Sequence, residues 1–198
     1  SQDDTGGRHH SQGGIRFATD PDETAQCCQQ MLGSLLGGFR VDRVLVEAKK
    51  QVLKEYFAGV MVNDAHRKLM LIFSSVGGTG IEELAQTSPE RVHTFLIDPR
   101  EGLYEFQARN LLIEAEVPSA ELAGLSDILV KLYQTARKYE ARSAEMNPIA
   151  LADDGKFYAL DARLTIDDNA VFRHPELGIK VAREFDHPPT PLECVAYQ

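Results

Sequence analysis

The chain has 198 residues, 43% of them hydrophobic and 26% charged, which is enough for one sizeable core or two small lobes. A net charge of −9 argues against nucleic acid or an anionic membrane surface as the main partner. No apolar run reaches the roughly 18 residues that a membrane helix needs, and no signal peptide is visible. The three cysteines, two of them adjacent, indicate a reducing compartment rather than a disulfide framework.

The first 14 residues contain four glycines and have no periodicity. They are either an irregular start or a glycine-rich flap over a phosphate, with Arg8 as its charge. A short strand is predicted at 15–18. A helix follows, because Asp20 is a good N-cap, Pro21 suits the first helical position and Glu23 completes a capping box. Its apolar positions are expected to face the core: Ala25, Cys28, Met31, Leu32 and Leu35.

The middle of the chain alternates irregularly between strands and helices. Strands are predicted at 43–47, 55–62, 68–74 and 92–97, and helices from 81, over 104–115 and after Pro118. The last helix has an apolar stripe typical of a core face: Leu122, Leu125, Ile128, Leu129 and Leu132. The glycine loop at 75–80 either holds an anion at a helix start or makes a tight turn. Without regular βαβ alternation, the pattern predicts an α+β fold.

The stretch 144–163 predicts two strands joined by a tight turn. Its flanks are apolar, and Asp154-Gly155 is a hairpin signal. The loop has either three residues, 153–155, with Gly155 in the left-handed conformation, or two residues. The two lengths differ by one residue in register, and a one-residue shift moves side chains to the opposite face.

The three-residue loop places Asn147 opposite Asp161 and Glu145 opposite Arg163, with all four side chains on one face. The two-residue loop puts Asn147 and Asp161 on opposite faces. An amide and two carboxylates on one face form an oxygen-rich surface, and such hard ligands suit Mg²⁺. The alternative interpretation is an ordinary hairpin whose polar side chains face water.

Seven segments carry a resemblance to a known family. They are Leu45-Val46-Glu47, Lys54-Glu55-Tyr56, Gly77-Gly78 with Ile81-Glu82, Ile97-Asp98-Pro99, Glu145-Met146-Asn147-Pro148, Leu160-Asp161-Ala162 and the stretch 167–175. In this order they resemble the β subunit of succinyl-CoA synthetase (succinate-CoA ligase) and related acyl-CoA ligases, such as malate-CoA ligase and ATP-citrate lyase. The resemblance covers about residues 5–177.

The resemblance implies an ATP-grasp fold, in which two α+β lobes close over a nucleotide. Residues 1–46 would form a partial N-terminal lobe, residues 47–178 the C-terminal lobe, and residues 179–198 an extended tail or linker. The early N-terminal lobe, a nucleotide lysine just before Ser1 and a C-terminal CoA domain would lie outside the chain.

The resemblance also implies site residues. Asn147 and Asp161 match the family's Mg²⁺ ligands, in agreement with the hairpin argument. Glu145 matches a carboxylate that helps to hold a phosphorylated histidine of the partner subunit. Glu47 matches a hinge-strand residue that meets the nucleotide base and ribose, and Glu55 matches a second carboxylate that contacts the nucleotide.

The N-terminal turn is matched less closely. Gly7, Arg8 and His9 match a glycine-arginine-glycine turn over the nucleotide phosphates, but His9 stands where the family usually has glycine, which would reshape the turn. Val76 stands where many members carry a glutamate before the paired glycines.

The implied activity is that of an ADP-forming acid–CoA ligase of the tricarboxylic acid cycle. A phosphoryl group passes from ATP, or GTP, to a histidine and then to a carboxylate, and CoA finally displaces phosphate. The implied partners are a CoA-binding α subunit that carries the histidine, a small carboxylic acid and CoA, in the cytoplasm or the mitochondrial matrix. This chain alone would be inactive. The alternative is a non-catalytic ATP-grasp domain that binds a nucleotide or a partner.

Overall fold

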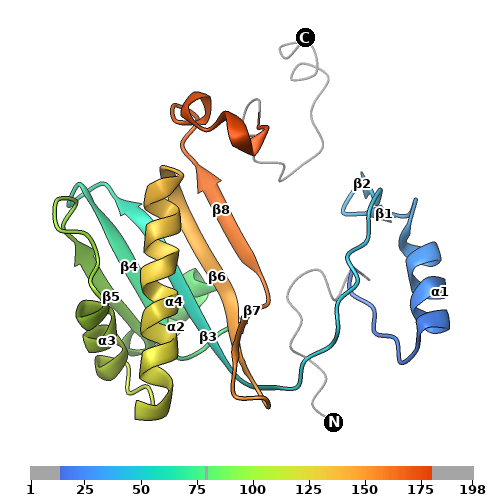
Figure 1. Ribbon diagram of the computed structural model, residues 1–198, viewed down its shortest axis with the longest axis horizontal. Coiled ribbons are helices and arrows are strands. Elements are labelled where there is room, and N and C mark those ends of the chain that lie inside the picture. Colours follow the sequence, from blue (N-terminus) through green and yellow to red (C-terminus); the bar gives the residue numbers. More distant parts are fainter. Residues whose placement is uncertain (1–13, 79, 180–198) are drawn as a thin grey trace. The chain divides into compact units, whose positions relative to one another are not determined.

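The computed structural model describes residues 14–78 and 80–179 (Figure 1). The chain divides into two compact units, one formed by Ser1–Lys49 with Arg183–Gln198 and the other by Lys50–Ala182. The described part of the first unit holds α1 (Pro21–Met31) and a small hairpin of β1 (Leu35–Leu36) and β2 (Phe39–Arg40). None of the described helices is long and apolar enough to cross a membrane.

Helix α1 begins at the predicted N-cap Asp20, but the Glu23 side chain bonds to Thr19 and does not complete a capping box with the Asp20 N–H. The Glu23 N–H donates to Asp20 Oδ1 at 2.8 Å, and the Glu23 carboxylate accepts from the N–H and the hydroxyl of Thr19. Its predicted core face is wrong, because no residue of α1 is buried and Leu35 is 75% exposed. In the described part of this unit the only sheet is β1 with β2, two residues each, which is too small a surface for α1 to bury a face.

The strands predicted at 15–18 and 43–47 are not formed. Both segments are irregular, and Leu45 is 80% exposed. A strand needs a neighbour for its backbone hydrogen bonds, and an apolar run does not specify one. Among the described residues of the first unit, only β1 and β2 pair with each other.

The second unit is one antiparallel sheet with two long helices. Its elements, in order, are β3 (Val52–Asn63), β4 (Lys68–Ser74), α2 (Ile81–Thr87), η1 (Pro89–Arg91), β5 (Val92–Ile97), α3 (Glu105–Glu114), α4 (Ser119–Lys138), β6 (Ala141–Ala152), β7 (Phe157–Ala159), β8 (Ala162–Ile166), η2 (Val171–Arg173) and η3 (Pro175–Leu177). The strand order is β5-β4-β3-β6-β7, and β8 also pairs with β6. This mixed architecture confirms the predicted α+β class, and β4 and β5 have the predicted bounds.

One face of the sheet packs against α3 and α4, and Figure 1 shows α4 lying along this face. The predicted stripe of α4 is confirmed, because Leu125, Leu129 and Leu132 are buried in the core. Tyr56 of β3 also lies in this core, and its hydroxyl donates to Glu121 of α4. The helix layer therefore occupies one face, and polar residues that alternate with core positions point to the other face.

Candidate functional site

The hairpin that starts with β6 has the three-residue loop. Gly155 has a φ of 75°, in the left-handed region, and its N–H donates to the Ala152 carbonyl at 3.0 Å. The Ala152 N–H donates to the Lys156 carbonyl, also at 3.0 Å, so residues 153–155 form the loop. The register predicted for a three-residue loop is confirmed.

This register forms both predicted cross-strand pairs. Glu145 of β6 and Arg163 of β8 are Cα partners. Two residues further along β6, the Asn147 N–H donates to the Asp161 carbonyl at 3.1 Å. Backbone pairing thus holds these four polar residues at neighbouring positions.

Glu145 and Asn147 belong to the sheet face turned away from α4. Their neighbours Ala144 and Met146 pack in the core that α3 and α4 cover. Because side chains alternate between the faces of a strand, the intervening Glu145 and the following Asn147 lie on the opposite face. Both are partly buried.

A bulge in β6 coincides with the candidate metal ligand. Between Tyr56 and Ala58 the register of β3 against β6 shifts, so that Asn147 and Pro148 together face Phe57. A bulge changes the direction of side chains locally and is common at functional sites. The position of Asn147 is therefore set by local strand irregularity as well as by pairing.

The loop after β4 contacts both β3 and β6 close to Asn147. The Gly77 N–H donates to the Glu55 carbonyl at 3.1 Å, and the Gly78 N–H donates to Asn147 Oδ1 at 2.9 Å. Glu55 precedes the core residue Tyr56, so it lies on the face turned away from α4. Glu55 and Asn147, from different strands, thus flank one glycine loop.

The carboxylates of this face lie in an unfavourable environment for negative charge. Burial raises the pKa of Glu145 above its ordinary value of 4.5, and Glu82 of α2 and Asp161 raise it further, while Arg163 lowers it. Burial also raises the pKa of Glu55. A cationic ligand, or a donor hydrogen-bonded to these carboxylates, would relieve this cost.

The donor set at Asn147 and Asp161 fits Mg²⁺. Both side chains offer hard oxygen atoms, and Mg²⁺ takes one or two protein ligands and completes its shell with water and phosphate oxygens. Among the described residues no group of three or more His, Cys, Asp or Glu side chains could hold a metal ion.

The remaining predicted residues belong to the first unit or lie outside the described residues. Glu47 is an exposed residue of the first unit. Gly7, Arg8 and His9 lie outside the described residues. Their nucleotide contacts stay predictions.

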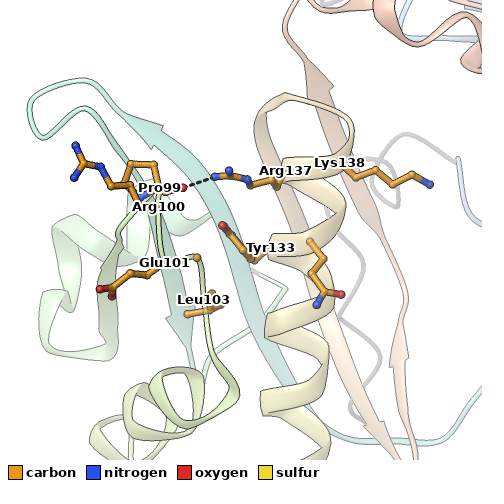
Figure 2. Close-up of a pocket in the computed structure, with 9 residues that line it drawn as sticks. Pro99, Arg100, Glu101, Leu103, Tyr133, Arg137 and Lys138 are labelled. Carbon is orange, nitrogen blue, oxygen red and sulfur yellow. Dashed lines mark hydrogen bonds between the residues drawn. The ribbon is translucent and has the colours of Figure 1, made fainter.

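Two cavities of the second unit differ in their relation to the site. One, of about 390 Å³, is lined by Lys54, Glu55 and Tyr56 and by the turn between α3 and α4. The other, of about 400 Å³, lies between the loop after β5 and α4 and includes none of the predicted residues. Figure 2 shows Arg137 pointing across it toward Pro99, whose carbonyl accepts its Nη1–H at 2.9 Å.

The sequence interpretation missed two participants. Gly78 had been assigned only to a loop, and its contact with Asn147 joins residues 69 positions apart. Glu82 had been noted only within a matched segment. The paired glycines were a visible signal of close backbone approach, but neither glycine spacing nor charge pattern specified the partner.

Comparison with known proteins places this geometry in a family. A family model described as the ATP-grasp domain matches residues 1–151, and the chain belongs to this family. Over 183 residues it is 38% identical to the GDP-forming succinate–CoA ligase subunit beta of Thermus thermophilus, covering 92% of this chain and 48% of that protein. It is 40% identical over 189 residues to the ADP-forming succinate–CoA ligase subunit beta 1 of Archaeoglobus fulgidus, covering 95% and 48%. The chain thus spans about half the length of these relatives.

Solved structures show the same fold. ATP citrate lyase from Methanothrix soehngenii, in complex with citrate and coenzyme A, aligns with a TM-score of 0.62 at 17% identity over 91% of this chain and 42% of that chain. A dinucleotide-forming acetyl-coenzyme A synthetase of Ca. Korarchaeum cryptofilum aligns with a TM-score of 0.53 at 14% identity, over 77% and 69%. The predicted ATP-grasp fold is confirmed.

Proposed function

We propose that the chain is the nucleotide-binding part of an acid–CoA ligase of the succinate–CoA ligase β type. The hairpin register carries the proposal, because it brings Glu145, Asn147 and Asp161 to neighbouring positions. The match to β subunits of succinate–CoA ligases over most of the chain supports it. The substrates would be a small carboxylic acid, CoA and ATP or GTP.

Phosphoryl transfer depends on positioning and charge neutralisation more than on a protein nucleophile. Asn147 and Asp161 would hold Mg²⁺, which neutralises charge on the nucleotide phosphates when bound. The half-buried carboxylate of Glu55 would accept hydrogen bonds from the nucleotide. By resemblance, Glu47 would contact the base and ribose.

The N-terminal turn has a separate role in the proposal. By resemblance, Gly7, Arg8 and His9 would cover the phosphates, with the Arg8 guanidinium as their cationic partner. The imidazole of His9, in place of glycine, would alter the backbone there.

Glu145 would orient the phosphorylated histidine of a CoA-binding α subunit. A carboxylate that accepts a hydrogen bond from one imidazole nitrogen fixes the orientation of the ring and exposes the other nitrogen. Burial of Glu145 raises its pKa, so an N–H donor from the partner would stabilise the ionised carboxylate. The partner's histidine would thereby gain a defined position without a further protein nucleophile.

The proposed location is the cytoplasm, because three cysteines, two of them adjacent, fit a reducing compartment better than a disulfide framework.

The test is a calorimetric titration of the chain with Mg-ATP and with Mg-GTP, repeated in excess EDTA and with Asp161→Asn. We expect binding that requires the metal, prefers one base, and weakens at least tenfold in the variant. Asp153→Asn, at the exposed hairpin loop, is the matched control and should bind as the parent chain does. Binding unchanged by EDTA and by Asp161→Asn would remove Asp161 from the metal site.

A further inference from the structure

The glycine loop between β4 and α2 is built to approach the polar sheet face. Gly77 packs so closely on β3 that a Cβ there would lie 2.8 Å from the Tyr56 carbonyl oxygen and 2.9 Å from its nitrogen. Real Cβ atoms do not come this close to backbone atoms, so position 77 requires glycine. The backbone of the loop at Gly77 therefore packs directly on the backbone of β3, next to Glu55.

Gly78 is restricted mainly by its backbone conformation, because the close atom is the end of the flexible Glu55 side chain. The φ of Gly78 is +77°, a conformation that residues with a Cβ rarely adopt, and a Cβ there would lie 2.8 Å from Glu55 Oε2. Its N–H donates to Asn147 Oδ1 at 2.9 Å, a good hydrogen-bond distance. The missing side chain thus allows one backbone N–H to reach across to β6.

This hydrogen bond favours one orientation of the Asn147 amide. An N–H donor must face the amide oxygen rather than the amide nitrogen, so Gly78 selects one of the two flip states. An amide oxygen has two lone pairs and can accept a hydrogen bond while it ligates a metal. Partners of this kind orient metal ligands, and their loss typically costs about 10- to 100-fold in metal affinity.

We infer that Gly78 is a positioning residue for divalent-cation binding, and that its backbone N–H holds the Asn147 amide oxygen toward the cation. The inference rests on the proposed function, in which Asn147 and Asp161 are the metal ligands. This role differs from the phosphate cradle and the tight turn that the sequence suggested for the loop. In this role the loop positions a side chain of a distant strand.

The experiment is a Mn²⁺ titration of the intact chain in the presence of ADP, in which free Mn²⁺ is measured by electron paramagnetic resonance. Gly78→Ala should raise the Mn²⁺ dissociation constant about 10-fold or more. The matched control is Gly178→Ala, since Gly178 also has a positive φ, +65°, but a Cβ there would meet nothing within 4 Å. It should bind Mn²⁺ as the parent chain does.

A double-mutant cycle separates positioning from general damage to the fold. If Gly78 acts through Asn147, then Gly78→Ala should have little further effect in an Asn147→Ala background. Additive losses would overturn the inference. A measurement that needs no variant is the scalar coupling across the hydrogen bond between the Gly78 ¹⁵N and the Asn147 ¹³Cγ nuclei, which should be detectable. Its absence would also overturn the inference.

The two proposals fail in different ways. If Asp161→Asn weakens Mn²⁺ binding and Gly78→Ala does not, only the role of Gly78 falls. If the parent chain binds no Mn²⁺ with ADP, or if Asp161→Asn binds it unchanged, the metal site itself falls and the role of Gly78 falls with it.

Discussion

Glu145 and Arg163 are register partners across β6 and β8, yet burial of Glu145 outweighs the nearby guanidinium and its pKa lies above the ordinary 4.5. A raised pKa means that the folded state favours the protonated acid. The ionised form therefore opposes folding above the folded pKa, and this cost disappears below the unfolded value. A residue that is kept ionised at a cost to the fold is expected where the charge serves binding.

We predict that Glu145→Gln stabilises the chain at pH 8 and leaves its stability unchanged at pH 4. The gain should be smaller than the about 1.4 kcal/mol that one full pKa unit represents, because solvent screens this partly exposed group. Urea unfolding at both pH values measures it. Glu114→Gln, on the exposed side of α3, is the control and should show no such pH dependence. Destabilisation by Glu145→Gln at pH 8 would contradict the prediction.

The hairpin shows what the sequence could predict about the site. Asp154-Gly155 predicted the turn and left two loop lengths open, and the structure has the three-residue loop, whose length fixes every pair beyond it. The bounds of β4 and β5 were predictable for a similar reason, because turn residues such as Asn63, Asp64 and Pro99 flank continuous apolar runs. Turn residues and apolar runs thus predicted strands that pair across a short turn, such as β3 with β4 and β6 with β7.

Other features depended on partners that local signals do not identify. The apolar positions of α1 predicted a core face, but the described part of its unit has only a sheet of two two-residue strands and no residue of the helix is buried. The contact between Gly78 and Asn147 arises because β3 lies between β4 and β6 in the sheet, and strand order is not encoded in either segment. Likewise, the effect of Glu82 on Glu145 follows from tertiary packing of α2.

The tight packing of Gly77 predicts a clear cost of adding one methyl group. Gly77→Ala would force its Cβ against the backbone of Tyr56, which cannot move without disturbing β3. We expect a loss of about 1–3 kcal/mol in the free energy of unfolding, as for other overpacked positions. Gly80→Ala in the same loop is the matched control. Its Cβ would lie 3.8 Å from Glu82 Oε2, an ordinary contact, so its effect should be small. Equal effects in urea unfolding would refute the packing argument.

Replacing tyrosine by phenylalanine should affect stability more at Tyr56, which links β3 to α4 by a hydrogen bond, than at Tyr158. Tyr56 is buried, and its hydroxyl donates to the Glu121 carboxylate, whereas the Tyr158 hydroxyl donates at 2.7 Å to the exposed Asp154. Hydrogen bonds to charged groups contribute about 1.5–3 kcal/mol, and exposed ones contribute less. Tyr56→Phe should therefore lower the free energy of unfolding by about 1.5 kcal/mol, and Tyr158→Phe by well under 1 kcal/mol. Thermal and urea unfolding measure both variants. A larger loss for Tyr158→Phe would reverse the assignment.

The segment that holds η2 and η3 contacts the residues just after α4, where the Glu140 carboxylate binds two of its side chains. Glu140 accepts from Arg173 Nε and Nη2, both at 2.7 Å, and lies 3.2 Å from His174 Nε2. Hydrogen bonds from Arg173 lower the pKa of Glu140 below its ordinary 4.5. A lowered pKa stabilises the folded state above 4.5, and this contribution is lost as the pH falls through the folded value.

We predict that Arg173→Met weakens this attachment at neutral pH and that acid does the same to the parent chain. Amide hydrogen exchange of residues 167–178 should become at least several-fold faster in the variant at pH 7, while exchange in the core of α4 stays unchanged. Lys131→Met, which breaks an exposed ion pair with Asp127 within α4, is the matched control and should leave 167–178 unchanged. The difference between the parent chain and Arg173→Met should shrink as the pH falls below 4.5. If the same difference persisted once Glu140 was protonated, its charge would not be what holds the segment.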